Sequence, residues 1–460
     1  MTISTSTDAL GDIDRRHVFH PFSVLDEHET TGPRRVIVRG QGTTLTDDQG
    51  RTYLDAMAGL WCVNVGYGRV EIADALREQA LKLPYYHSFS SMATDTPALL
   101  AERLISIAPE GMSKVLYGNS GSDANDTQVK LVRMYNNLLG RPHKKKIISR
   151  LRGYHGVSIA SASLSGLPGM HRQFDLPLPE IRHTRAPYRL WEARPGEDDA
   201  AFSARLADEL EQMILEEGPD TVAAFIAEPV QAAGGVIVPP EGYFPAIQAV
   251  LRKYDVLLIA DEVVCGFGRL GTWFGSQRLG LEPDLMTVAK GITSAYIPLS
   301  ACIVSEKVWR VLADGSAGTT FSHGYTYTSH PLAAAAAMAN LDVIERDGLR
   351  EQALARGERL RKGLQDAFSG HPLVGEVRGM GLVAAVEFVA EQDPPKPFDP
   401  VGSVAGRIVA EALQRGVITR ALPEADTISF SPPFVVTEEE IDTMVRVARE
   451  AADVVAAEVA

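Results

Sequence analysis

The chain has 460 residues, of which 45% are hydrophobic and 23% charged, a balance typical of a globular protein with a large core. Its formal net charge of −14, from 45 basic and 59 acidic residues, argues against nucleic acid as the main partner. The 3 cysteines are too few and too scattered for a disulfide framework or a zinc site, so we expect no metal and a reducing, cytoplasmic location.

The N-terminal part is predicted to hold a hairpin and two helices. Residues 1–16 are polar and are expected to be loosely attached, with no signal peptide. Short apolar runs at 36–38 and 44–46, flanked by glycine-containing turns, predict the strands of the hairpin. Apolar residues at near-helical spacing predict a helix over 70–82, and another helix is expected over about 95–108.

From residue 115 onward, apolar runs that read as strands alternate with helical stretches. This alternation predicts an α/β fold with a mostly parallel sheet that helices cover on both faces. A helix over 332–346 is expected to lead into a smaller α+β domain, and no run is long enough to cross a membrane. The predicted divisions are an N-terminal segment that belongs to the small domain (1–65), a large domain (66–334) and the C-terminal small domain (335–460).

Two of the predicted strands end in charged residues. The run at 256–260 is followed by Asp261, and the run at 285–289 is followed by Lys290. Open α/β sheets bind ligands at the carboxyl ends of their strands. A lysine there can form a Schiff base with a carbonyl, and an aspartate can keep a pyridinium nitrogen protonated. Either residue alone would more often be a solvated loop residue, but the pair suggests pyridoxal phosphate (PLP).

A turn of small residues, 118–122, lies between a predicted strand and a predicted helix. Its backbone N–H groups at the helix start, with the hydroxyls of Ser120 and Ser122, could bind a phosphate. The alternative is a helix cap, for which Ser122 is a suitable residue, and the two interpretations are compatible. The turn matches neither a Walker loop nor a hydrolase nucleophile elbow.

Aromatic residues in polar or glycine-rich loops are candidates for the wall of a pocket. Tyr154 lies between two glycines and could stack on a flat cofactor, although a core tyrosine would have the same sequence. The same choice between pocket and core holds for Phe22, Trp61 and Phe89. Arg420 follows a short predicted strand. Its guanidinium is either solvated or able to bind a carboxylate through two parallel N–H···O hydrogen bonds.

With these motifs in order, the chain resembles the class III PLP-dependent aminotransferases, and within them the amine:pyruvate (omega) transaminases. The resemblance extends from His20 to about Val445, and it is carried by motifs at 59–66, 119–126, 153–156, 227–231, 261–269, 289–291 and 323–327. It implies fold type I, PLP as cofactor, an amine donor and a keto acid as substrates, and a homodimer with shared active sites that could assemble further into a tetramer.

The resemblance also implies residue roles. Lys290 and Asp261 would be catalytic, as the Schiff-base lysine and the partner of the pyridinium. The residues expected to bind the cofactor are Ser120, Gly121, Ser122, Tyr154, Glu228, Asp261, Val263, Lys290, Tyr325 and Thr326, the last through the neighbouring subunit. The residues expected to bind substrate are Phe22, Trp61, Phe89, Tyr154, Ala232 and Arg420.

Four positions depart from what is common in the family. Ala233 stands where relatives acting on ornithine or 4-aminobutyrate usually have a glutamate that pairs with the arginine matching Arg420, and Val264 stands where they tend to have glutamine. Both departures favour transfer from a primary amine or omega-amino acid to pyruvate. Asp123 replaces glutamate, and Ala295 replaces a glycine near Lys290. An aminomutase or decarboxylase on the same scaffold is the alternative, and a non-catalytic PLP-binding regulator fits the negative charge poorly.

Overall fold

The computed structural model describes residues 7–459, and the first six residues lie outside the described residues. The expectation that residues 1–16 are loosely attached is wrong for the part described. Residues Thr7–His17 form helix α1, which packs against α2 (Leu25–Thr31). The Arg15 side chain donates a hydrogen bond of 3.2 Å to the carbonyl of Glu29, which ties the two helices together.

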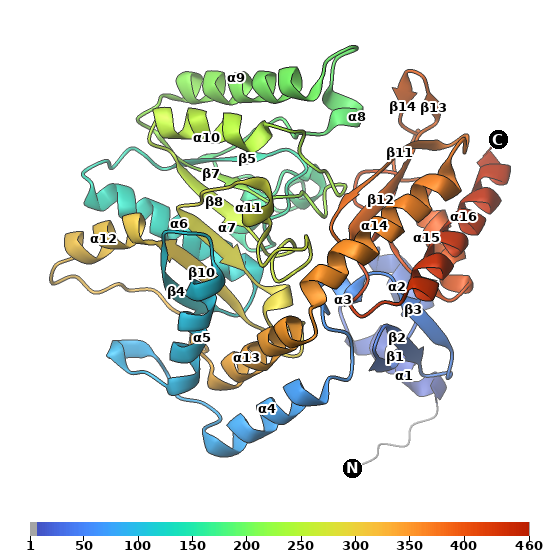
Figure 1. Cartoon of the computed structure of the whole chain (residues 1–460), viewed down its shortest axis with the longest axis horizontal. Helices are drawn as coiled ribbons and strands as arrows, with labels where there is room; N and C mark the ends of the chain where they lie inside the picture. The colour runs from blue at the N-terminus through green and yellow to red at the C-terminus, as the bar shows by residue number, and fades with distance from the viewer. Residues whose placement is uncertain (1–6, 460) are drawn as a thin grey trace.

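A seven-stranded sheet forms the centre of the larger part of the molecule (Figure 1). Its strands lie in the order β4 (Met112–Gly118), β10 (Ser300–Ser305), β9 (Leu285–Val288), β8 (Leu257–Asp261), β7 (Val222–Ala227), β5 (Lys146–Arg150) and β6 (Ile181–Thr184). Strand β10 runs antiparallel to both of its neighbours, and the other neighbouring pairs are parallel. All residues of β7, β8 and β9 are buried, which explains why these strands are continuous apolar runs.

Successive residues of the central strands serve two different cores. Phe225 and Leu258 belong to the core on the side of α9 (Asp199–Glu217) and α10 (Tyr243–Lys253). Their neighbours Ile226 and Ile259 belong to the core that α6 (Gly121–Leu138) covers. Side chains alternate across a strand, so both faces of the sheet are buried. The predicted α/β class with a mostly parallel sheet is confirmed.

The helices predicted over 70–82, 95–108 and 332–346 are present with nearly the expected bounds. Helix α13 (Pro331–Arg346) packs against α4 (Val70–Lys82) and α5 (Asp95–Ile107). The remaining elements of this part are α7 (Ile159–Leu164), α8 (Arg189–Glu192), α11 (Gly275–Leu279), α12 (Glu306–Gly315) and the 3₁₀ turns η1 (Phe89–Ser91), η2 (Pro168–Met170) and η3 (Lys290–Ile292). The short helix α3 (Ala58–Trp61) lies beside the smaller part (Figure 1).

Two four-stranded sheets form the smaller part of the molecule, at the right of Figure 1. One combines β1 (Ile37–Gln41), β2 (Thr44–Asp47), β3 (Thr52–Asp55) and β15 (Val417–Ile418). Strands from the N-terminal and C-terminal parts of the chain therefore share one sheet. The other combines β11 (Val374–Met380), β12 (Val383–Phe388), β17 (Thr427–Phe430) and β16 (Arg420–Ala421). Also present are helices α14 (Leu349–Phe368), α15 (Ala405–Gln414) and α16 (Glu438–Val459) and the hairpin β13 (Glu391–Gln392) and β14 (Pro395–Lys396).

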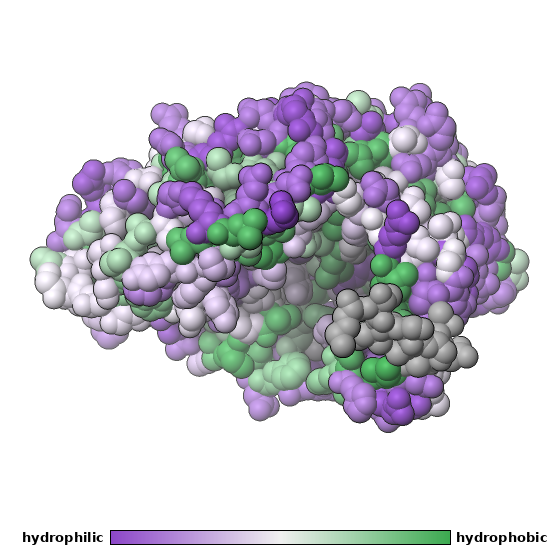
Figure 2. Space-filling view, turned by 90° about the horizontal axis from the view of Figure 1, so that it is seen from below, coloured by the Kyte–Doolittle hydropathy of each residue, from purple (hydrophilic) through white to green (hydrophobic). Residues whose placement is uncertain are grey.

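The predicted domain boundaries at 65/66 and 334/335 stay a prediction, and the second of them falls within α13. Between residues 7 and 459, no helix is both long and apolar enough to cross a membrane. The face drawn in Figure 2 is hollowed near its middle, and hydrophobic residues gather around the hollow.

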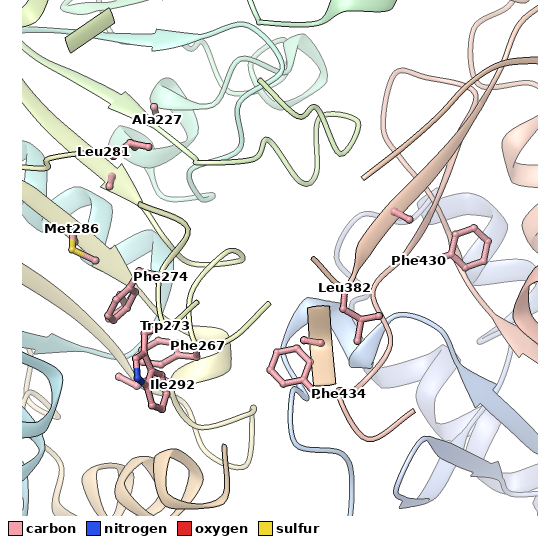
Figure 3. Close-up of a cluster of buried hydrophobic side chains, with 14 of the residues drawn as sticks. Ala227, Phe267, Trp273, Phe274, Leu281, Met286, Ile292, Leu382, Phe430 and Phe434 are labelled. Atoms are coloured by element: carbon pink, nitrogen blue, oxygen red, sulfur yellow. The ribbon is translucent and has the colours of Figure 1, made fainter. Parts of the chain in front are cut away.

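One hydrophobic cluster connects the large sheet with the C-terminal part of the chain (Figure 3). Phe267 lies on the sheet side of this cluster and Phe434 on the other side. The guanidinium of the buried Arg269 lies 4.7 Å from the centroid of the Phe434 ring and donates hydrogen bonds to the carbonyls of Leu382 and Pro432. These contacts join the loop after β8 to the segments before β12 and after β17.

Candidate active site

A cavity of about 340 Å³ lies at the carboxyl ends of β8 and β9, beside the turn that leads into α6. It is the position expected for a ligand site in an open α/β sheet. Of the residues that the sequence analysis singled out, the structure brings together in its wall Ser120, Gly121, Ser122, Tyr154, Glu228, Asp261, Val263 and Lys290. These residues come from five segments that are far apart in the chain.

Lys290 begins the 3₁₀ turn η3, two residues after the end of β9, and its amine lies near the ring of Trp61. Its Nζ lies 6.0 Å from the centroid of the Trp61 ring. Burial lowers the pKa of the Lys290 amine, because the charged form loses its hydration in the cavity. The backbone of Lys290 has φ of 46°, a left-handed conformation that costs an L-residue about 1–2 kcal/mol. Such strain is common at functional sites, where the surrounding structure maintains it.

Asp261 is held by three hydrogen bonds in a nearly dry environment. The backbone N–H of Val263 donates to Oδ1 at 3.1 Å, and the amide of Asn125 donates to Oδ2 at 2.8 Å. The Nδ1 atom of His155 lies 2.8 Å from the same Oδ2. The hydroxyl of Thr287 donates to the oxygen of the Asn125 amide at 2.8 Å, which fixes the amide with its nitrogen toward the carboxylate. The position and orientation of the Asp261 carboxylate are therefore determined before any ligand binds.

Neither Asn125 nor His155 is among the site residues predicted from the sequence. Asn125 lies about one helical turn after Gly121, on the same face of α6, and His155 directly follows Tyr154. The Nε2 atom of His155 is buried, and no hydrogen-bond partner is found for it within residues 7–459. The helical spacing of Asn125 from the phosphate turn was the one signal in the sequence that could have found it.

The turn before α6 combines a helix cap with a cradle for an anion. The N-cap is Ser120 rather than Ser122, because the Ser120 hydroxyl accepts from the N–H of Asp123 at 3.2 Å. Gly121 and Ser122 are then the first helical residues, and their N–H groups lack an acceptor within the helix. A Cβ on Gly121 would lie 3.0 Å from Val263, so any side chain there would reduce the space above the helix start. Anions bind at such helix starts.

These features fit the pyridoxal phosphate predicted from the sequence. The same cavity is lined by the phosphate cradle, a buried amine (Lys290) and an oriented carboxylate (Asp261). A Cβ on Gly156 would lie 2.6 Å from the Ser122 hydroxyl, so this glycine keeps the cradle open. Tyr154 and Val263 both line the cavity and offer an aromatic and an aliphatic surface.

Glu228 is buried and holds the loop that carries Tyr154. Its Oε1 accepts from the N–H of Tyr154 at 3.0 Å, and its Oε2 accepts from the N–H of Ala232 at 3.0 Å. Burial raises the pKa of the Glu228 carboxyl, because desolvation disfavours its charged form. The Ala232 side chain itself is buried in a neighbouring core cluster and does not line the cavity.

Arg420 lies against the same aromatic ring as Lys290. Its guanidinium carbon is 5.2 Å from the centroid of the Trp61 ring. No carboxylate in the described part of the chain forms an ion pair with Arg420, and Ala233 offers none. Burial lowers the pKa of the guanidinium, while the nearby Tyr154 acts in the opposite direction.

Seven of the predicted site residues do not line the cavity of the single chain: Trp61, Ala232 and Arg420, and also Phe22, Phe89, Tyr325 and Thr326. Phe22 is 73% exposed to solvent and Phe89 is 47% exposed. Thr326 is exposed, and its carbonyl accepts from the Tyr85 hydroxyl at 2.6 Å. Tyr325 lies behind the start of α6, where its hydroxyl donates to the carbonyl of Asp123 at 2.9 Å. Their roles stay predictions.

Ala295 contributes to the wall of the cavity in the conformation that a glycine would adopt. Its φ is 62°, so the loop after Lys290 keeps the left-handed turn although the glycine that is usual there is absent. An alanine in this conformation costs about 1–2 kcal/mol relative to a right-handed one. The alanine at this position therefore adds strain to the loop.

The fold and the cavity together define a fold-type I PLP-dependent enzyme. The chain belongs to the class III aminotransferase family, since the family model "Aminotransferase class-III" matches residues 26–451. Class III aminotransferases use PLP, so the predictions of family, fold and cofactor are confirmed, and the substrates are an amine and a keto acid in general terms.

Relatives of known sequence and structure cover almost the whole chain. The chain is 54% identical to an uncharacterised aminotransferase of Sinorhizobium fredii (95% of this chain, 94% of the relative). It is 51% identical to a diaminobutyrate–2-oxoglutarate transaminase of Halomonas elongata (96% and 95%). The omega transaminase of Pseudomonas jessenii, solved in complex with PMP, is similar in structure with a TM-score of 0.95 and 47% identity, over 98% of this chain and 99% of that one.

Proposed function

We propose that this protein transfers an amino group from a primary amine or omega-amino acid to pyruvate, and so forms an aldehyde or ketone and alanine. The observation that carries the proposal is the position of Arg420 beside Trp61 and near Lys290, with no ion-pair partner among residues 7–459. A single guanidinium suits an acceptor with one carboxylate. Among residues 7–459, no arginine lines the cavity itself, and Arg420, beside Trp61, is the guanidinium that we assign to the acceptor carboxylate.

In this proposal the residues of the cavity have separate tasks. Lys290 attaches the cofactor covalently and then moves a proton at the donor carbon, as base and as acid. Burial, which lowers its pKa, favours the neutral amine that can accept a proton. Asp261 faces the ring nitrogen as a carboxylate, and PLP when bound supplies the electron sink. The helix start at Gly121 and Ser122 would hold the phosphate, and Tyr154 and Val263 would contact the ring.

We also propose that the active unit is a homodimer. Phe22 and Thr326 are exposed in the single chain, and each was predicted to complete an active site. Apolar side chains on the same N-terminal segment are exposed as well, among them Phe19 at 79%. Exposed apolar groups of this kind are typical of a surface that a partner covers. A cytoplasmic location stays a prediction.

The proposed reaction is tested with a panel of amine donors and two acceptors, with the amino acid product quantified. We expect alanine to form from pyruvate in a 1:1 ratio to the carbonyl product, and little glutamate to form from 2-oxoglutarate. If glutamate forms faster than alanine, the preferred acceptor is 2-oxoglutarate, the acceptor in the name of the Halomonas elongata relative. Consumption of the amine without any amino acid product would favour an aminomutase or a decarboxylase.

Replacement of Arg420 by alanine is expected to weaken the pyruvate half-reaction far more than the amine half-reaction. The acceptor carboxylate loses a charge-assisted bidentate contact, whereas an uncharged donor makes no such contact. The loss should be on the order of 2–3 kcal/mol, or about 30- to 150-fold in specificity constant. Stopped-flow absorbance measures the two half-reactions separately. Arg172→Ala is the control, because Arg172 is 76% exposed, and equal losses in both half-reactions would make Arg420 structural.

A further inference from the structure

Three potential metal ligands come together in the N-terminal segment, away from the cavity that holds Lys290. They are Asp14 from α1, His20 from the connection after it and His28 from α2. Oδ1 of Asp14 lies 2.8 Å from Nε2 of His20 and 3.7 Å from Nε2 of His28. The two imidazole rings are 4.3 Å apart at their centroids. All three ligand atoms lie within 4.8 Å of one another.

The hydrogen bonds of the segment leave one of these atoms unexplained. Oδ1 of Asp14 and Nε2 of His20 are within hydrogen-bond distance of each other. Nε2 of His28 is too far from the same oxygen for a hydrogen bond, and it is buried without a partner in the part of the chain that the structure describes. A buried polar atom without a partner requires a reason, and a bound ion is one of the recognised reasons. The atom faces a carboxylate oxygen and a second imidazole nitrogen.

A single metal ion between the three atoms would satisfy all of them. Zinc binds imidazole nitrogen and carboxylate oxygen at about 2.0–2.2 Å, so tetrahedral ligands lie about 3.3 Å from one another. The observed separations of 2.8 and 3.7 Å lie on either side of this value. The two Nε2 atoms lie within 4.8 Å of each other, so side-chain shifts of up to about 1.5 Å would form the site. Two histidines with one carboxylate are a recurrent ligand set for divalent first-row metals, with at least one position left for water.

We propose that Asp14, His20 and His28 form a binding site for a divalent first-row transition-metal ion such as Zn²⁺. The prediction that the chain binds no metal rested on its few, scattered cysteines, and this site uses none of them. The ion would connect α1 to α2 and would hold the loop at 18–24, which carries Phe22. Since α1 and α2 are otherwise joined by few polar contacts, the metal would contribute to the stability of the N-terminal segment.

The proposal is tested on the full-length, PLP-loaded protein after treatment with a chelator. Calorimetric titration with Zn²⁺ is expected to show one bound ion per chain. Removal of a residue that hydrogen-bonds to a metal ligand lowers the affinity for the metal about 10- to 100-fold. Loss of a ligand itself, in His28→Ala, should therefore lower the affinity for Zn²⁺ on the order of 100-fold or more. His17→Ala is the matched control, because His17 is an exposed histidine of the same helix. Zn²⁺ should also raise the thermal midpoint of the wild type and of His17→Ala, but not of His28→Ala.

In the zinc titrations, either of two results would overturn the site: no zinc binding by the wild type, or equal affinities in the wild type and His28→Ala. A titration of the wild type with Co²⁺ needs no variant, so it remains informative if His28→Ala fails to fold. Cobalt bound to two imidazoles and a carboxylate shows visible bands without strong sulfur-to-metal charge transfer. Strong charge-transfer absorption would place the ion on a cysteine and would exclude the proposed ligands.

Discussion

Replacement of Lys290 by alanine is expected to abolish turnover, with a loss of at least about 10⁴-fold, while PLP still binds. This loss is at the upper end of what general acid–base catalysis contributes, because the substitution removes the covalent attachment and the proton carrier together. Binding should persist, since the helix start at Gly121 and the carboxylate of Asp261 remain. Turnover, the bound PLP per chain and the absorbance spectrum of the purified variant are the measurements.

The covalent attachment has its own test in the unmodified protein. Borohydride reduction should fix the cofactor on one peptide, and mass spectrometry should identify that peptide as the one containing Lys290. The variant Lys290→Arg keeps a positive charge in the cavity but cannot attach the cofactor, so it should be as inactive as Lys290→Ala. A reduced label on any other lysine, or substantial turnover in Lys290→Arg, would remove Lys290 from the proposed mechanism.

Replacement of Asp261 by asparagine is expected to reduce kcat on the order of 100- to 1,000-fold, which is typical for removal of one preorganised electrostatic contact. An amide carries no charge to stabilise a protonated ring nitrogen. It also has one acceptor oxygen where Asp261 has two. That oxygen can serve Asn125 and His155, and the amide NH₂ would then face the N–H of Val263, with a stability cost of about 1–3 kcal/mol.

The same Asp→Asn substitution at Asp284, away from the cavity, separates the electrostatic effect on catalysis from the cost to folding stability. Asp284 precedes β9, at the opposite edge of the sheet, and its Oδ2 accepts from the backbone N–H of Leu258 at 2.9 Å. Asp284→Asn should therefore lower stability while kcat stays near that of the wild type. Both variants are compared by kcat, PLP content and thermal midpoint. If Asp261→Asn retained near-wild-type turnover with full PLP content, its carboxylate would have no part in the chemistry.

The course of the backbone around the site was largely predictable from short-range patterns. The strands ending at Asp261 and before Lys290 are uninterrupted apolar runs, as strands buried on both faces must be, and the small residues at 118–122 mark a strand-to-helix turn. The assignment of the cap to Ser122 was wrong by two residues, because Asp123 returns its carboxylate to the N–H of Ser120 and begins the helix earlier. Helix α1 was missed because its residues 7–17 include few apolar ones.

By itself, the sequence determined the class of fold, the family and the chemistry available at the strand ends, because periodicity, turn residues and strand-end charges are local properties. Only the tertiary structure decided which distant side chains meet. The Asn125 and His155 contacts to Asp261 bring residues more than 100 positions apart into hydrogen-bond distance, and burial that no local pattern reports lowers the pKa of Lys290. The cluster of Asp14, His20 and His28 likewise depends on how α1 folds back on α2, since hydrogen bonding and metal binding depend on distances in space.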